Sequence, residues 1–401
     1  MLTIQKFGGS SVANAERIKH VAGIIANTYT SGSSVAVVLS APGDMTDDLI
    51  TMARSINPKA SRREMDMLLS TGEQQSVALC AMALEELGVP AVSMTGWQAG
   101  ILTTSQYSNA RIREIDAERI LAELDRKRVV LVAGFQGITR EREITTLGRG
   151  ASDTTAVALA AALKADVCRI YTDVEGVYTA NPRVVPAARK LDEITYDEML
   201  ELASMGAMVL HNRCVEMARK YSVRLEVRSS FTDKPGTIVK ETSKMEVTKI
   251  SGIAKDSNVA RLALIGLRDE PGVAFRVFQL LANEKINVDI ILQSIGRDNT
   301  KDISFTVAKD ELSNAERALL DNQQAIGFDA LDVSDTLCKV SIVGAGMINS
   351  SGIAAEMFEA LYNANVNIHM ISTSEIKVSV LIDDLNADAA MRMIHKQFFG
   401  E

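Results

Sequence analysis

The sequence predicts an α/β domain built on a mainly parallel open sheet, followed by a small α+β unit that is present twice. Two observations carry this prediction. Short, unbroken apolar segments of strand length alternate with helical segments as far as about residue 231, which is typical of strands that are buried on both faces. Beyond residue 250, similar residues recur at a constant offset of 80 positions, which indicates an internal duplication.

The composition is that of an ordinary globular protein with two or three domains. The 401 residues are 47% hydrophobic and 23% charged, and the chain is too long for one compact core. A formal net charge of -8 argues against nucleic acid as the main partner. We expect no signal peptide, because Phe7 and the charged residues soon after it leave no room for one. No apolar run reaches the roughly 18 residues of a membrane span, so we expect a cytoplasmic protein. The four cysteines lack metal-ligand spacing, which indicates packing roles in a reducing compartment.

The first predicted strand covers residues 2–7 and runs into Gly8-Gly9-Ser10-Ser11, and a helix begins near Asn14. Small residues let backbone N–H groups approach a phosphate closely, and a helix N-terminus offers unpaired donors with a partial positive charge. Lys6, at the end of the strand, can place a full positive charge on the same phosphate. A tight strand-to-helix turn with an exposed lysine is the alternative for so short a motif, so its interpretation depends on other stretches.

The next elements complete one sheet. We expect strands over 34–40, 91–95, 128–135, 165–172 and 224–227, and one helix over 65–87 that stops at Gly88. Ligands of such sheets bind at the carboxyl ends of the strands. Three loops rich in small and polar residues lie there, at 8–11, 40–47 and 134–137. Their shared location predicts a single active-site crevice.

Two further stretches carry chemistry. Gly148-Arg149-Gly150-Ala151-Ser152-Asp153-Thr154-Thr155 precedes an alanine-rich helix, and helix capping is enough to explain its serine, aspartate or threonine. Arg149, between two glycines, is suited to grip a carboxylate or phosphate in bidentate fashion. The stretch 171–183 follows a strand and contains tyrosines and an arginine. It is either an ordinary loop or a site for a purine ring and its phosphates.

The pattern changes near residue 240, and residues 241–249 are charged and without a strong period, which indicates a linker. Beyond it, Pro271-Gly272-Val273 aligns with Ser351-Gly352-Ile353. Each copy predicts a strand, a glycine turn, an amphipathic helix, two strands, a helix and a final strand. No candidate nucleophile, metal cluster or acid–base pair recurs with the repeat. A duplicated sensor or scaffold is therefore expected rather than a second active site.

Taken together, these stretches resemble the monofunctional aspartokinases. The similarity is carried by residues 6–12, 148–155 and 171–178, extends to 65–73 and 371–376, and covers essentially the whole chain. It implies an amino-acid-kinase fold, with a mainly parallel open sheet between helical layers, followed by two ferredoxin-like α+β ACT domains. The implied domains are the kinase at 1–240, a linker with the first regulatory strand or strands at 241–260, and ACT domains at 261–335 and 336–401. In such enzymes the first ACT unit is inserted within the second, so residues 248–256 are expected to pair with the last 65 or so residues.

The resemblance implies phosphorylation of the side-chain carboxylate of L-aspartate by ATP, with Mg²⁺, to give 4-phospho-L-aspartate. A carboxylate is already a nucleophile at neutral pH, so such an enzyme needs positioning and electrostatic support rather than a general base. Lys6 is expected to neutralise the transferred phosphoryl group, Asp153 to orient Lys6 or approach magnesium, and Glu73 to receive the substrate ammonium. The other expected substrate contacts are Ser40, Thr46, Phe135, Arg149 and Ser152, and the expected ATP contacts are Lys6, Gly8, Gly9, Ser10, Thr172, Asp173, Tyr178 and Arg183.

The ACT pair implies feedback inhibition by lysine, threonine or both, at the first step of lysine, threonine and methionine biosynthesis, and a homodimer or larger homo-oligomer. Turn chemistry and strand packing are the alternative account of the residues that match effector positions. These residues are Asp269, Asn287, Asp289 and Gln293 in the first unit, and Ile353, Ala354, Asn367 and Thr373 in the second.

One residue departs from the family pattern. Met208 stands where many relatives have a lysine that meets ATP phosphate, so Arg183, magnesium or another cation compensates, or nucleotide affinity is lower. Two alternatives to an aspartate kinase stay open: a kinase for another acid such as glutamate or carbamate, and a non-catalytic amino-acid sensor that keeps the scaffold. Met208 favours the sensor, whereas the intact charged candidates Lys6, Glu73, Arg149 and Asp153 oppose it.

Overall fold

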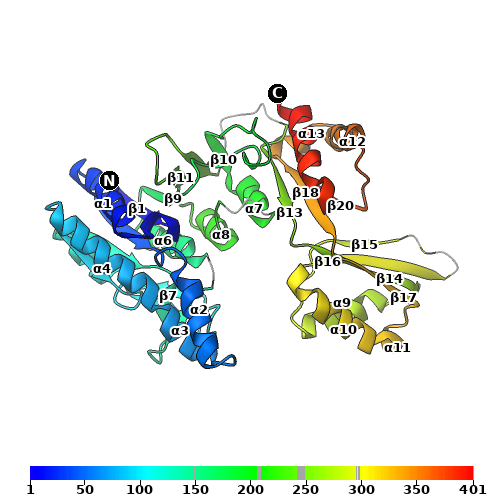
Figure 1. The fold of residues 1–401 in the computed structure, drawn as a ribbon, viewed down its shortest axis with the longest axis horizontal. Helices are drawn as coiled ribbons and strands as arrows, with labels where there is room; N and C mark the ends of the chain where they lie inside the picture. Colours follow the sequence, from blue (N-terminus) through cyan, green and yellow to red (C-terminus); the bar gives the residue numbers. More distant parts are fainter. Residues whose placement is uncertain (149, 206–208, 242–248, 295, 297–298, 401) are drawn as a thin grey trace. The chain divides into compact units, whose positions relative to one another are not determined.

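A computed structural model describes residues 1–148, 150–205, 209–241, 249–294, 296 and 299–400 (Figure 1). The chain divides into two compact units. The first contains residues 1–178 and 190–204 and the described residues of 209–241. The second contains residues 179–189, residue 205 and the described residues from 249 onward.

The first unit is built on an eight-stranded sheet with the order β10-β12-β11-β9-β1-β2-β6-β3. Among its described strands all pairings are parallel except that of β11 with β12. The predicted mainly parallel sheet is therefore confirmed, with small differences at the strand ends. The strands are β1 (Leu2–Phe7), β2 (Ser34–Leu39), β3 (Ala91–Met94), β6 (Val129–Ala133), β9 (Val167–Thr172), β10 (Glu193–Thr195), β11 (Leu225–Ser229) and β12 (Thr237–Lys240).

Helices cover both faces of this sheet. On one face α1 (Ala15–Thr30) and α4 (Thr71–Glu86) lie side by side (Figure 1), where Val21 and Val77 pack in one core with Val37 and Leu131. On the other face α6 (Ala151–Ala162) packs against β1, β2 and β9. The remaining helices of the unit are α2 (Met45–Ile56), α3 (Arg62–Leu69), α5 (Glu118–Asp125), α7 (Tyr196–Ser204) and α8 (Asn212–Lys220), and α8 packs beside α6.

The prediction of one helix over 65–87 is wrong, because α3 and α4 meet at Ser70 as two separate helices. The Ser70 hydroxyl donates to the Met67 carbonyl at 2.8 Å. The Ser70 carbonyl accepts the side-chain amides of Gln136 at 2.8 Å and Gln74 at 3.1 Å. Side chains that compete for backbone groups in this way interrupt a helix. The Thr71 hydroxyl likewise donates to the Leu68 carbonyl at 2.8 Å. The hydrophobic period of 65–87 does not reveal such side-chain bonds.

A second, smaller sheet in the first unit was not predicted. Its order is β5-β4-β7-β8, and its strands are β4 (Ile101–Thr103), β5 (Ile112–Ile115), β7 (Gln136–Ile138) and β8 (Ile144–Thr146). Strands of three or four residues are too short to show a period of two. This sheet matters for the site, because β7 follows β6 directly and β8 leads into the loop before α6.

The second unit contains two four-stranded antiparallel sheets, each with helices packed on it. The first, β15-β16-β14-β17, comprises β14 (Ala260–Arg268), α9 (Val273–Asn283), β15 (Ile291–Gln293), β16 (Thr300–Val307), α10 (Leu312–Asp321), α11 (Gln323–Ile326) and β17 (Ala330–Ser334). The second, β13-β18-β20-β19, comprises β13 (Gly252–Asp256), β18 (Leu337–Val343), α12 (Ile353–Asn363), β19 (Met370–Ser374), β20 (Lys377–Asp383) and α13 (Ala387–Phe399). Short 3₁₀ helices lie at Gly9–Val12, Lys309–Glu311, Ala345–Asn349 and Asp384–Asn386.

The duplication appears in the backbone as well as in the sequence. Gly272 and Gly352, 80 residues apart, precede α9 and α12 with φ of 92° and 88°, a left-handed conformation that favours glycine. The strand β13, which comes before the first copy, pairs with β18 of the second, so the expected insertion is confirmed. The prediction that both copies end in a strand is wrong for the second copy. That copy ends in α13, and β13 supplies its fourth strand.

Two expectations about environment can be compared with the structure. All four cysteines are buried and unpaired, as packing roles require. Among the described residues no helix combines the length and the apolar character needed to cross a membrane.

Candidate active site

The centre of the candidate site is an ion pair between Lys6 and Asp153. The Lys6 Nζ lies 2.6 Å from Asp153 Oδ1, and the two side chains are only 12% and 11% exposed. Lys6 is near the end of β1, and Asp153 is in the first turn of α6, which packs against β1. The fold thus joins two residues that are 147 positions apart in the sequence, and it leaves them partly accessible at the carboxyl edge of the sheet.

The glycine turn after β1 packs against the loop after β2. The Gly43 amide donates to the Gly9 carbonyl at 3.0 Å, and the Ser40 amide donates to the Phe7 carbonyl at 3.1 Å. A Cβ on Gly9 would lie 2.9 Å from the Ala41 carbonyl oxygen. Glycine is required at Gly9 because the two loops approach too closely for any side chain. Two of the three predicted loops therefore form one packed structure.

Replacing Gly9 by alanine is expected to force these loops apart. We expect Gly9→Ala to lower the free energy of unfolding by about 1–3 kcal/mol and catalytic turnover by about tenfold or more, since the turn beside Lys6 moves. Chemical denaturation and steady-state kinetics measure both. Gly23→Ala is the matched control, because Gly23 lies in α1 and an added Cβ there meets nothing within 4 Å. Equal behaviour of the two variants would contradict the prediction.

Glu73 is a buried carboxylate next to this turn. It lies in α4 and is 3% exposed, and its Oε1 accepts the Ala41 amide at 3.3 Å. Within the described part of the chain Oε2 has no hydrogen-bond partner. Burial raises the pKa of Glu73 to about 8. A buried carboxylate oxygen without a partner is costly, so the site is suited to a ligand that brings a cationic donor.

The third predicted loop reaches the same place from β6. The Gly134 amide donates to the Leu39 carbonyl at 3.1 Å, and a Cβ on Gly134 would lie 2.9 Å from Ser152 Oγ. The next residue, Phe135, has a left-handed φ of 67°, and its amide donates to Thr155 Oγ1 at 3.1 Å. The side chain of Phe135 is 7% exposed and belongs to a small apolar cluster. The start of α6 is therefore fixed directly against the end of β6.

Of the other predicted substrate residues, the structure describes Ser40, Thr46 and Ser152. Ser40 follows β2 directly, and its carbonyl accepts the Ser76 hydroxyl of α4 at 2.7 Å. Thr46 is the second residue of α2 and is half-buried, and Ser152 is 6% exposed in the first turn of α6. Arg149 lies outside the described residues.

The predicted nucleotide residues begin at the end of β9, the strand beside β1. The Gly8 amide donates to the Tyr171 carbonyl at 3.4 Å, which places Thr172 and Asp173 next to the glycine turn. The Thr172 hydroxyl donates to Asp173 Oδ1 at 3.0 Å. The Tyr178 hydroxyl donates to Glu175 at 3.3 Å. The exposed Ser10 follows the turn, Arg183 is an exposed residue of the second unit, and Met208 lies outside the described residues.

Two basic residues that the sequence analysis missed support the approach to α6. The Arg213 guanidinium donates to the Leu147 carbonyl at 2.6 Å and to the Ala110 carbonyl at 3.1 Å. The ring of His211 lies so close to Gly150 that a Cβ there would be 2.7 Å from the ring. Burial lowers the pKa of His211. Neither residue stands in a recognisable motif, because their partners are more than 60 positions away in the sequence.

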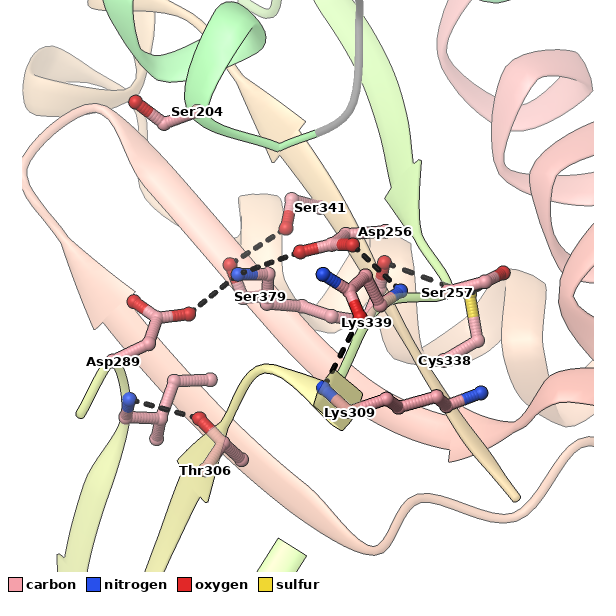
Figure 2. A network of polar contacts seen from close by, with 12 residues as sticks. Ser204, Asp256, Ser257, Asp289, Thr306, Lys309, Cys338, Lys339, Ser341 and Ser379 are labelled. Carbon is pink, nitrogen blue, oxygen red and sulfur yellow. Dashed lines mark hydrogen bonds and ion pairs between the residues drawn. The ribbon is translucent and has the colours of Figure 1, made fainter. Parts of the chain in front are cut away.

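The predicted effector positions lie in the second unit, and two of them form ion pairs. Asp289 contacts Lys339 of β18, and Figure 2 shows the Lys339 ammonium between Asp289 and Asp256. The Lys339 side chain is 8% exposed and that of Asp289 is 49% exposed, so only the lysine end of this ion pair is shielded from water. Asp269 contacts Lys301 at 2.9 Å. Of the others, Asn287, Gln293, Asn367 and Thr373 are exposed, Ala354 is half-buried at the start of α12, and Ile353 is a core residue at 3% exposure.

Comparison with known proteins identifies the class. The amino acid kinase family matches residues 1–229, and the ACT domain matches residues 262–323 and 340–398. The protein thus joins an amino acid kinase domain to ACT domains. An aspartokinase of Mycolicibacterium smegmatis is 50% identical over 403 residues, which cover 99% of this chain and 96% of that protein.

Solved structures agree with this class. E. coli aspartokinase III, in complex with aspartate and ADP, has a TM-score of 0.84 at 25% identity and full coverage of both chains. An aspartate kinase from Synechocystis is 48% identical, with a TM-score of 0.57, and the match covers 99% of this chain and 69% of that one. The chain belongs to the aspartokinase family.

Proposed function

We propose that this protein transfers the γ-phosphoryl group of ATP to the side-chain carboxylate of L-aspartate, giving 4-phospho-L-aspartate and ADP. The observation that carries the proposal is the Oε2 of buried Glu73, which has no hydrogen-bond partner among the described residues and lies beside the loops that hold Lys6 and Asp153. Such a site fits an amino acid whose ammonium group replaces the missing partner. The E. coli relative that binds aspartate and ADP supports the same substrates here.

The proposed chemistry depends on position and charge. A substrate carboxylate oxygen attacks the γ-phosphorus, the bond to the bridging oxygen breaks, and ADP leaves with that electron pair. The Lys6 ammonium stabilises the charge on the transferred group, and Asp153 orients Lys6. The glycine turn formed by Gly8, Gly9 and Ser10 surrounds the phosphates. The proposed further contacts are Thr172, Asp173, Tyr178 and Arg183 for the nucleotide, and Ser40, Thr46, Phe135, Arg149 and Ser152 for aspartate.

Magnesium, when bound, would neutralise charge on the phosphates. Asp153 is a carboxylate whose position fits it, because it is at the edge of the sheet beside the glycine turn and its side chain remains 11% exposed. The principal role of Asp153 in the protein itself is to hold the Lys6 ammonium. This arrangement requires no general base, since the reacting carboxylate carries no proton at neutral pH.

We further propose feedback inhibition by lysine, threonine or both through the ACT domains, in a homodimer or larger homo-oligomer, as expected for the first step of the biosynthesis of these amino acids. E. coli aspartokinase III is known in complex with lysine and aspartate. In the present chain Asp289, a predicted effector contact, is already paired with Lys339. Inhibition requires that the effector bind one arrangement of the enzyme more tightly than another.

A hydroxamate assay with ATP and magnesium tests the proposed function. Turnover that depends on L-aspartate is expected, because Glu73 and the Lys6 pair supply both charges that this substrate needs. Turnover only with glutamate or carbamate would indicate a kinase for another acid, and no turnover with any acid would indicate a non-catalytic sensor. Adding lysine, threonine or both to the same assay identifies the effector.

A further inference from the structure

Asp66 is a buried carboxylate that the proposed chemistry does not use. It lies in α3, is 0% exposed, and accepts hydrogen bonds from two distant segments. The Ser108 amide donates at 2.9 Å and the Ser108 hydroxyl at 3.2 Å. The Thr146 amide and hydroxyl both donate at 2.8 Å. Within the described residues Asp66 forms no ion pair, so hydrogen bonds alone offset the burial of its charge.

These partners lie at the entrance to the candidate site. Thr146 ends β8, and the loop to α6 follows directly. Gly148 of that loop lies against the backbone of Ser108, since a Cβ there would be 3.5 Å from the Ser108 carbonyl. Arg213 bonds the carbonyls of Leu147 and Ala110 and so joins the same two segments. Asp66 and Arg213 therefore fix the segment that precedes Ser152 and Asp153.

The same carboxylate also connects this segment to Glu73. Asp66 lies in α3, and α4, which carries Glu73, begins directly after Ser70. The Ser70 carbonyl is in turn bonded to the side chain of Gln136, at the start of β7. Asp66 therefore lies just before the helix that carries Glu73, and its hydrogen bonds to Thr146 fix the end of β8, from which the chain continues to α6.

We propose that Asp66 is a positioning residue for L-aspartate binding, which holds Thr146 and the residues Leu147 and Gly148 after it at a fixed place relative to Glu73. This inference rests on the proposed function. A carboxylate is needed at Asp66 because both of its oxygens face N–H and O–H donors. An asparagine keeps one oxygen for the two backbone amides, which both donate to Oδ2. Its NH₂ group replaces Oδ1, where it faces the second, 3.1 Å branch from the Ser108 amide and forces both hydroxyls to change from donors to acceptors, so the anchor is weakened.

Steady-state kinetics of Asp66→Asn test the proposal. We expect the KM for L-aspartate to rise by about 10- to 100-fold while the KM for ATP changes little, because the displaced residues lead to the start of α6, where Ser152 is proposed to contact the amino acid. Thr145→Val is the matched control. Thr145 is in the same strand and is equally buried, but its hydroxyl pairs with Thr103 at 2.6 Å and not with Asp66. This control is expected to lose stability without a selective change in the KM for aspartate.

A milder variant decides the question if Asp66→Asn does not fold. Ser108→Ala combined with Thr146→Val removes only the hydroxyl donors and keeps both backbone amides, so a smaller rise of about threefold or more is expected. An unchanged KM for aspartate in the folded variants, or an equal rise in Thr145→Val, overturns the inference and leaves the proposed function standing. A wild-type protein without aspartate-dependent turnover overturns both.

Discussion

Glu73→Gln is expected to weaken L-aspartate binding by about 2–5 kcal/mol, or roughly 30- to 4,000-fold in Kd, because the buried partner of the substrate ammonium loses its charge. Isothermal titration calorimetry with L-aspartate measures this loss directly. Glu86→Gln is the matched control, since Glu86 ends the same helix with a side chain that is 64% exposed. Wild-type affinity in Glu73→Gln would show that Oε2 does not meet the substrate.

The same residue makes binding depend on pH. The pKa of Glu73 is about 8 because burial disfavours its charge, so the empty site is largely protonated at pH 6. Binding of an ammonium group must displace that proton. The wild-type Kd is therefore expected to weaken by about tenfold per unit as pH falls from 8 to 6, with release of a proton, whereas Glu73→Gln shows no such slope. Titrations in buffers of different ionisation enthalpy count the protons.

The free protein should show the opposite trend in stability. Between the ordinary pKa of 4.5 and the raised value of about 8, the folded state holds a proton on Glu73 that the unfolded state has lost. This group therefore lowers the free energy of unfolding as pH rises through that window, by roughly 1 kcal/mol per unit. Glu73→Gln should accordingly gain stability over the wild type at pH 8 and gain little at pH 5. Urea denaturation at the two pH values measures the difference.

Lys6→Ala is expected to lower kcat by at least about 10²- to 10³-fold, because a preorganised cation at the transferred group is lost. The fold should persist, since the remaining site is held by the loop contacts of Gly9 and Gly134 and not by Lys6. Asp153 would lose its counter-ion in this variant, so some loss of thermal stability is expected. The kinetic measurements should therefore be made well below the melting temperature of the variant.

Lys19→Ala is the control for Lys6→Ala. Lys19 is in α1 with a side chain that is 65% exposed, and its ion pair with Glu86 is a surface pair of the kind that contributes little. Lys19→Ala removes one positive charge from the same domain as Lys6→Ala does, but it does not alter a residue of the candidate site. Turnover near the wild-type level in Lys6→Ala would exclude the assigned role, and equal losses in both variants would point to net charge instead.

Much of the fold could be predicted from the sequence because its causes are local. Strands such as 34–39 are buried on both faces and read as continuous apolar runs, and Gly272 and Gly352 are required by a left-handed backbone at equivalent positions. The glycine turn beside Lys6 was visible for the same reason. Its meaning came from the resemblance of several stretches to one family, not from the turn itself.

The two errors have different causes. The helix predicted over 65–87 is divided by side chains at the break itself, because the hydroxyls of Ser70 and Thr71 donate to the carbonyls of Met67 and Leu68. The strand β13 reaches β18 across an intervening α+β unit, so the second copy needs no final strand of its own. Nothing in the period of either segment indicates such a contact.

The sequence by itself determined the class of fold and the order of the domains, and it proposed the residue types of the site, because burial, backbone conformation and charge are properties of short segments. Only the tertiary structure decided which of those residues meet. Lys6 pairs with Asp153, Asp66 joins Ser108 to Thr146, and Glu73 retains an oxygen that has no partner in the part of the chain that the structure describes. These contacts follow from the packing of helices on a sheet, which makes neighbours of segments that are far apart along the chain. A polar group that is buried in one segment must then find its hydrogen-bond partners in a neighbouring segment.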